Sequence, residues 1–283
     1  MLYWICPKDI LFYKISQKFR VPLVEQNLKE TFLLHVREEL PPTCLFVWQP
    51  HGLISISSVM YNSGLLKNQK YTPNHIVLQS LWHYIPFVGD FARYIRSIPS
   101  DYDSILSTLN AKESASIMIG GVKEMIESPQ KIIRIPERRG IFKLALESGT
   151  PLVPVITYGE NELFSRGEHW MLDNINDWLY SNFGMGIPFI SWGAIRNWCE
   201  LAYKPLKPIN SYTGKPISVT RTENPSDTDI EKLKDLYLLG VEELFKATAP
   251  PDYSLKTWKN ISVSSSNNTV EITCKHPHVA KKN

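Results

Sequence analysis

The stretch CLFVWQPHGLISISS, residues Cys44–Ser58, decides the fold. Its apolar first half ends abruptly at Gln49-Pro50-His51-Gly52, which predicts a buried strand followed by a sharp turn. Ligands of open α/β sheets bind beyond the carboxyl ends of the strands, so this turn would place His51 at a site for chemistry. Imidazole has an unperturbed pKa of about 6.5, so it can take and return a proton near neutrality. The alternative is that His51 is a turn residue that caps the next helix, expected over Gly52–Tyr61.

Alternating strand and helix patterns follow this stretch. Further strands are expected at His75–Leu78, Ser116–Ile119, Lys131–Ile135 and Leu152–Thr157. Helices are expected at Val24–Glu39, Asp101–Ala111, Gly140–Glu147 (with Gly149 as its stop) and Asp229–Lys246, and a helix, kink and helix over Leu81–Ile95. This alternation predicts an α/β fold with a central, mostly parallel sheet flanked by helices.

Composition narrows the possible functions. The chain has 283 residues, of which 43% are hydrophobic and 21% charged, the balance of an ordinary globular protein. The net charge of +3 is too small to imply nucleic-acid binding. The 13 Tyr, 11 Phe and 8 Trp favour an apolar ligand or a membrane interface, and an aromatic-rich core is the alternative. The four cysteines have no paired spacing, which fits a reducing compartment.

Both ends of the chain differ from its centre. Residues 1–40 begin with mixed apolar, aromatic and basic residues over Met1–Arg20, which predicts a segment that lies on a membrane, or else a helix docked on the protein itself. Residues 41–250 would form the catalytic domain. Residues 251–283 are polar and are expected to be a disordered tail. The tryptophan-rich region Asn161–Pro216 would be a cap over the site or a surface that faces a membrane, with short edge strands over Lys204–Ile217.

Two strand ends would meet at one edge of the sheet. The strand Ser116–Ile119 ends at Gly120-Gly121, and Glu124 follows. His51 and Glu124 are therefore candidates for an acyl-transfer site, in which His51 removes a proton from a hydroxyl and Glu124 orients the imidazole. Backbone N–H groups near Gly52 or Gly120-Gly121 would stabilise the oxyanion.

Three basic residues surround the start of a predicted helix. Arg138, Arg139 and Lys143, together with free helix N–H groups, would bind phosphates such as those of coenzyme A, and a solvated helix face is the alternative. Other chemistries fit poorly, because the chain has no Gly-x-Ser-x-Gly and no dinucleotide fingerprint. His276-Pro277-His278 lies in the polar tail without clustered ligands, so we expect no metal site.

The ordered motifs resemble the diacylglycerol acyltransferase type 2 family, which includes monoacylglycerol and wax-alcohol acyltransferases. Gln49-Pro50-His51-Gly52 is similar to the family's His-Pro-His-Gly, and Gly120-Gly121-Val122-Lys123-Glu124 to its Gly-Gly-x-x-Glu. The stretch Arg138–Glu162 resembles its Arg-x-Gly-Phe-x-Lys-x-Ala block, which continues through Val-Pro to Phe-Gly-Glu. Two positions depart from the pattern: Gln49 replaces the first histidine, and Ile141 replaces the Phe.

The resemblance implies a glycerolipid-acyltransferase-like sandwich and direct attack of a His51-activated hydroxyl on acyl-CoA. It also implies Gln49, Gly52, Gly120, Gly121, Arg138, Arg139 and Lys143 as residues that bind substrate or coenzyme A. No bound cofactor is expected, since acyl-CoA is a co-substrate. The expected partners are an acylglycerol or long-chain alcohol and the surface of a membrane or lipid droplet, on the cytosolic face of the endoplasmic reticulum or on lipid droplets. The alternatives are a lysophospholipid acyltransferase and a non-catalytic lipid-binding protein.

Overall fold

The computed structural model describes residues 22–62, 74–127, 131–167, 170–257, 261–264 and 270–272. The predicted membrane segment Met1–Arg20 and the pair His276-Pro277-His278 lie outside these residues. None of the helices in the described ranges is both long enough and apolar enough to cross a membrane.

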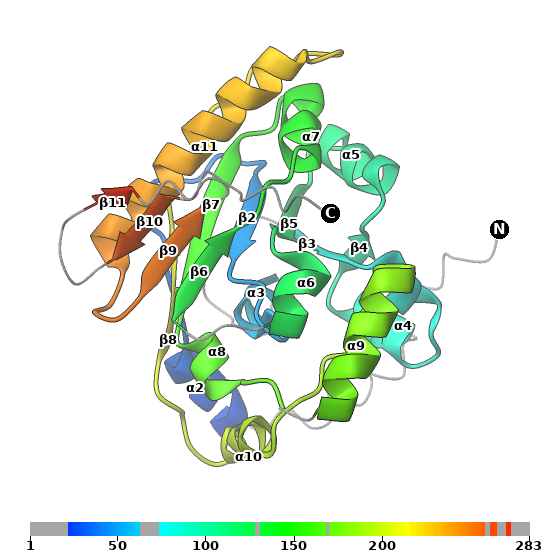
Figure 1. Ribbon diagram of the computed structural model, residues 1–283, viewed down its shortest axis with the longest axis vertical. Coiled ribbons are helices and arrows are strands. Elements are labelled where there is room, and N and C mark those ends of the chain that lie inside the picture. Colours follow the sequence, from blue (N-terminus) through cyan, green and yellow to red (C-terminus); the bar gives the residue numbers. More distant parts are fainter. Residues whose placement is uncertain are drawn as a thin grey trace, which may run out of the picture.

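A seven-stranded sheet forms the centre of the molecule (Figure 1). Its strands are β1 Phe32–His35, β2 Leu45–Gln49, β3 Asn74–Leu78, β4 Ser97–Pro99, β5 Ser114–Met118, β7 Leu152–Tyr158 and β8 Ile209–Thr213. They are ordered β1-β8-β7-β2-β5-β3-β4, and every neighbouring pair is parallel except β7 with β8. The prediction of a mostly parallel sheet is confirmed. The expected edge strand within Lys204–Ile217 is instead an inner strand, because β1 pairs with the far side of β8.

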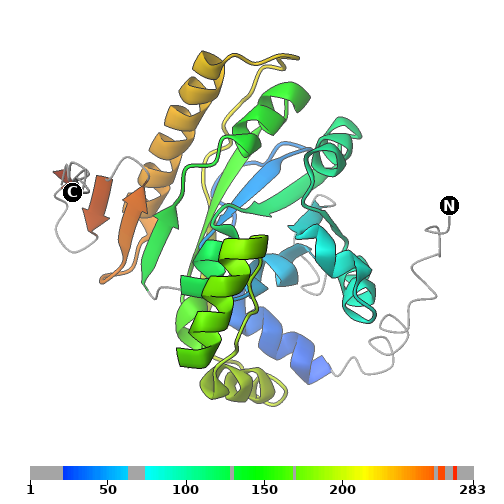
Figure 2. The same ribbon diagram turned by 45° about the vertical axis from the view of Figure 1, so that its right-hand side comes forward.

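Helices cover both faces of this sheet. The helical elements are α2 Pro22–Thr31, α3 Ile56–Asn62, η2 Ser80–Tyr84, α4 Val88–Tyr94, α5 Tyr102–Asn110, α6 Gly121–Glu127, α7 Gly140–Ser148, α8 Glu160–Leu163, α9 Trp170–Phe183, α10 Trp192–Glu200 and α11 Asp227–Thr248. Helices α5, α7 and α11 lie over one face, and α3 lies over the other (Figures 1 and 2). Helices α8, α9 and α10 lie beyond the end of the sheet where β2 and β7 finish (Figure 1).

Alternation along β2 explains how one buried strand contributes side chains to two layers. Successive side chains of a strand point to opposite faces. Leu45 and Val47 join the main core beneath α7 and α11, whereas Phe46 and Trp48 join a second cluster with Tyr61 of α3. All five residues of β2 are buried, as in a strand that is covered on both sides.

Two predicted helices differ from the observed ones. The expected helix Val24–Glu39 ends at Thr31, because the next four residues extend and pair with β8. The helix expected over Gly52–Tyr61 begins only at Ile56. Residues 52–55 therefore form a loop between His51 and α3.

A second, four-stranded sheet has the order β11-β10-β9-β6. Its strands are β6 Ile132–Ile135, β9 Ser254–Thr257, β10 Ile261–Ser264 and β11 Val270–Ile272. Three of them fall in the range 251–283, where the sequence predicted a disordered tail. In β9, Leu255 and Thr257 are buried while Lys256 is exposed, so this strand alternates between a core face and a solvent face.

Candidate active site

The ends of β2 and β5 bring His51 and Glu124 together. These strands are parallel neighbours, so the turns that follow them leave the sheet at the same edge. The His51 backbone N–H donates a hydrogen bond of 3.0 Å to Oε2 of Glu124, at the start of α6. The predicted proximity is therefore present, but the carboxylate holds the main chain of His51 rather than its ring.

The imidazole has a defined tautomer. Its Nδ1 lies 2.9 Å from the carbonyl oxygen of Gly52. A carbonyl oxygen only accepts hydrogen bonds, so Nδ1 carries the proton and Nε2 keeps its lone pair. Burial lowers the pKa of His51 below its ordinary value of 6.5, although its backbone contacts act in the opposite direction. A neutral ring near pH 7 is the form that can accept a proton.

Glu124 is buried in a space that only a glycine at position 120 leaves open. A Cβ on Gly120 would lie 1.5 Å from Oε2 of Glu124, which is impossible for real atoms. Burial raises the pKa of Glu124 to about 7, while the His51 N–H and Arg134 act to lower it. Its second oxygen, Oε1, has no hydrogen-bond partner among the described residues.

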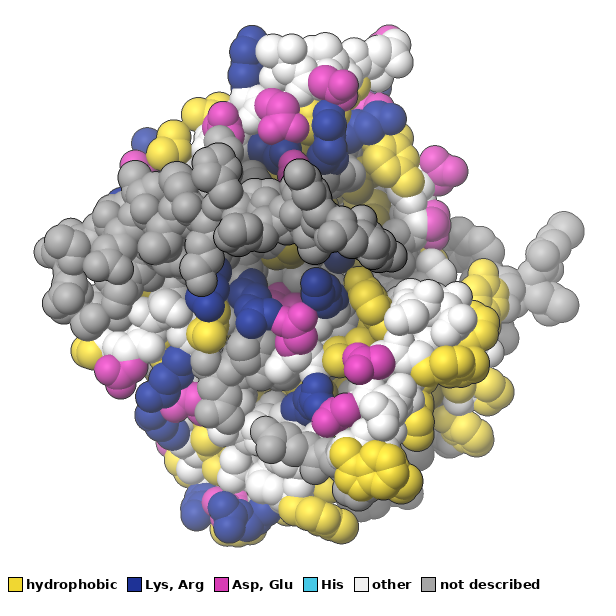
Figure 3. All heavy atoms as spheres, viewed as in Figure 1, with side chains coloured by type: hydrophobic (Ala, Val, Ile, Leu, Met, Phe, Trp, Pro, Cys, Tyr) yellow, Lys and Arg dark blue, Asp and Glu magenta, His cyan; other side chains and the backbone are white. Residues whose placement is uncertain are grey.

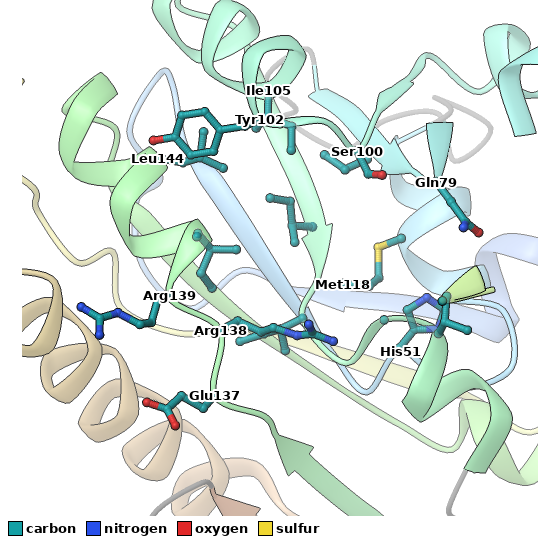
Figure 4. A pocket seen from close by; sticks show the side chains of 18 residues that line it. His51, Gln79, Ser100, Tyr102, Ile105, Met118, Glu137, Arg138, Arg139 and Leu144 are labelled. Atoms are coloured by element: carbon teal, nitrogen blue, oxygen red, sulfur yellow. The ribbon is translucent and has the colours of Figure 1, made fainter. Parts of the chain in front are cut away.

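A pocket of about 720 Å³ adjoins His51 and contains several of the predicted site residues (Figure 4). His51, Gly121, Arg138 and Arg139 line it, and its inner wall is apolar. Gly140 and Ile141, the first two residues of α7, also line it, so the start of this helix faces the pocket. Because helix N-termini and guanidinium groups both favour anions, this side of the pocket is suited to phosphate.

The three predicted basic residues differ in their surroundings. Arg139 pairs with Asp227 at 2.5 Å, and its guanidinium points toward α11, away from His51 (Figure 4). Arg138 points across the pocket toward His51, and no described carboxylate lies within ion-pair distance of it (Figure 4). Lys143 is outside the pocket lining, with its Nζ 5.4 Å from the ring centre of Tyr102 and paired with Glu147.

Two other predicted binding residues have structural contacts. Gln49 is fully buried beneath α11, where its Nε2 donates to the hydroxyl of Tyr237. It lies on the same face of the sheet as the pocket, but under α11, and it does not line the pocket. Gly52 has a φ of +58°, and a Cβ there would lie 2.2 Å from Oδ1 of Asn161. Gly52 therefore permits the close approach that holds the His51 loop against α8.

Sequence reasoning assigned no role to Glu160. This buried carboxylate at the end of β7 accepts the N–H groups of Ile56 at 2.7 Å and Ser57 at 3.1 Å, which begin α3. Burial raises its pKa to about 7. Glu160 follows the glycine turn after β7, as Glu124 follows the glycine turn after β5, so the same sequence pattern could have identified it. The two carboxylates hold the segment 51–57 at both ends.

A second polar pocket of about 330 Å³ lies on the other side of Arg138. Lys123, Glu124, Arg134 and Lys256 line it, so it joins α6 to the smaller sheet. Lys and Arg side chains gather near a hollow in the middle of the face shown in Figure 3, over β6 and α6. Glu124 therefore also borders a pocket that basic side chains line.

Comparisons with known proteins identify the kind of enzyme. A family model described as diacylglycerol acyltransferase matches residues 17–256. The chain belongs to the diacylglycerol acyltransferase family. It is thus an acyltransferase, as the ordered motifs of the sequence predicted.

Individual relatives agree with this family. The chain is 28% identical to human 2-acylglycerol O-acyltransferase 1, over 78% of this chain and 71% of the relative. It is 27% identical to Saccharomyces cerevisiae diacylglycerol O-acyltransferase 1, over 81% of this chain and 59% of the relative. Among solved structures, the 1-acyl-sn-glycerophosphate acyltransferase PlsC of Thermotoga maritima matches with a TM-score of 0.44 and 14% identity, covering 82% of this chain and 83% of that one.

Replacing Gly120 with alanine tests the placement of the Glu124 carboxylate. The added methyl group would displace Glu124 from the His51 N–H and leave buried groups unpaired, so we expect the free energy of unfolding to fall by about 1–3 kcal/mol. Gly193→Ala is the control, because a Cβ there meets nothing closer than 3.7 Å. Denaturant unfolding measures both. In the Glu124→Ala background, Gly120→Ala should lower the free energy of unfolding by a smaller amount. An equal loss in both backgrounds would contradict the contact between position 120 and the Glu124 carboxylate.

Proposed function

We propose that this acyltransferase uses acyl-CoA to acylate a mono- or diacylglycerol, with His51 as the general base. The substrate hydroxyl attacks the thioester carbonyl carbon while its proton moves to Nε2 of His51. The C–S bond then breaks, and the proton passes from the imidazolium to the departing thiolate. The observation that carries the proposal is the Nδ1 contact with Gly52, which leaves Nε2 as the basic atom beside the 720 Å³ pocket.

Glu124 is a positioning residue in this proposal. Its hydrogen bond to the His51 main chain fixes the turn that presents the ring, and it makes no hydrogen bond to the ring itself. The Gly121 N–H, at the start of α6 and beside the pocket, is the candidate oxyanion donor.

The donor site combines charge and apolar surface. Arg138, Arg139 and the start of α7 would bind coenzyme A phosphates, while the apolar wall formed by Val77, Ile117 and Leu144 suits an acyl chain. Lys143 does not line this pocket, but its Nζ lies beside the ring of Tyr102, which does.

The acceptor is an uncharged lipid rather than a lysophospholipid. Lysophospholipid acyltransferases typically carry an aspartate five residues after the histidine, and the residue at that position here is the buried Ile56. The family match to acylglycerol acyltransferases supports the same choice. Such substrates reside in membranes and lipid droplets, so we propose that the enzyme works at the surface of the endoplasmic reticulum or of lipid droplets.

Replacing His51 with glutamine tests the proposed base. Glutamine can hydrogen-bond but cannot take up the proton, so the rate of acyl transfer should fall roughly a hundredfold to ten-thousandfold. The matched control is His75→Gln, because His75 contacts Glu113 outside the described pockets. Purified protein with labelled acyl-CoA and monoacylglycerol measures both rates. Normal turnover by the His51 variant would refute the mechanism.

Replacing Arg138 with glutamine tests the donor site. The loss of a charge-assisted contact to phosphate should raise KM for acyl-CoA by roughly tenfold or more, with a smaller change in kcat. Arg37→Gln, at an exposed arginine outside the described pockets, should leave KM unchanged. An unchanged KM for the Arg138 variant at low salt would remove this residue from the donor site.

A further inference from the structure

A separate cavity of about 300 Å³ lies where the loop after His51, α3, α4 and α10 meet. Every side chain that lines it is apolar or aromatic, and none carries a formal charge. Phe91 of α4 is one of them, so the aromatic stretch Leu81–Ile95 contributes to an apolar pocket.

We propose that this cavity binds the acyl chain of the acceptor acylglycerol, an inference that rests on the acyltransferase function proposed above. Long-chain acylglycerols are mostly hydrocarbon and carry no charge. A wall without charged groups binds such a chain without desolvating any ion.

The cavity lies close to the proposed base along the chain. Leu53 and Ile54 line it, and they follow His51 by two and three residues. Two residues of fully extended chain span at most about 7 Å. An acceptor whose chain occupies the cavity would thus keep its glycerol hydroxyls within reach of His51.

The two cavities differ in the substrate that each can hold. Arg138 and Arg139 line the larger pocket, which suits a donor with phosphate groups. The smaller cavity has no cation to offer a phosphate, and so it suits the uncharged acceptor. Placing the two substrates on opposite sides of the His51 loop lets the hydroxyl meet the thioester at the imidazole.

The rim of the cavity is exposed and apolar. Phe91, Ile195 and Trp198 are 42%, 40% and 49% exposed, and nearby Trp192 of α10 is 85% exposed. Hydrophobic side chains also gather over α4 and α9 in Figure 3. Exposed aromatic groups on this scale are unfavourable in water and favourable at a lipid surface, from which an acylglycerol would enter.

Photolabelling tests the assignment directly. A 2-monoacylglycerol with a diazirine near the end of its chain is mixed with the full chain in phosphatidylcholine vesicles, irradiated and mapped by mass spectrometry. We expect labels on cavity residues such as Phe91, Ile195 and Trp198, in wild type and in His51→Gln alike. Labels from this probe in the larger pocket, or labelling of the small cavity by a diazirine acyl-CoA instead, would overturn the proposal.

A chain-length series provides the functional test. Each methylene that the cavity buries should improve kcat/KM for the acceptor about fourfold, until the cavity is full. Ile195→Asp should weaken this dependence, whereas Leu239→Asp, at a residue of α11 that is 57% exposed and outside the described pockets, should not. Turnover with no chain-length dependence would refute the inference and leave the proposed function intact. Chain-dependent labelling without any turnover would refute the function alone.

Discussion

The hydrogen bond between the His51 main chain and the Glu124 carboxylate is the contact on which the rest of the site depends. It requires that β2 and β5 be parallel neighbours, because only then do their following turns leave the sheet at one edge. It also requires a glycine at position 120, since a side chain there would occupy the place of the carboxylate. The fold thus brings the two motifs together, and the glycine provides the space for their contact.

The segment between His51 and α3 is held from both sides. Glu124 holds its first residue, and Glu160 from the end of β7 holds the N–H groups that open α3. Both carboxylates are buried, and burial raises the pKa of each to about 7. A buried acceptor that receives backbone N–H groups recovers part of its desolvation cost. These two contacts tie the position of the imidazole to the central sheet. His51 lines one cavity, and Leu53 and Ile54 of the same loop line another.

Much of the fold could be read from the sequence, because wholly apolar runs such as Leu45–Trp48 admit few structures other than a doubly covered strand. The proximity of His51 and Glu124 followed from the same logic. The form of their contact did not, because sequence spacing cannot distinguish a bond to a ring from a bond to a main chain. Sequence spacing also could not show that the Gln49 side chain packs against Tyr237 of α11 and does not line the pocket. The late start of α3 depends on Glu160, which is more than a hundred residues away in the chain and invisible to local patterns.

In the mechanism proposed above, His51 is a neutral base whose free lone pair is on Nε2. Nitrogen-15 NMR of histidine-labelled protein tests it most directly, with the signal assigned by its loss in His51→Gln. We expect a proton on Nδ1 and a titration midpoint below 6.5, because burial lowers the pKa of this ring. Below that midpoint the ring charges and the base is lost, and above it the base is available. A proton on Nε2 of the neutral ring, or a midpoint above 6.5, would contradict the account.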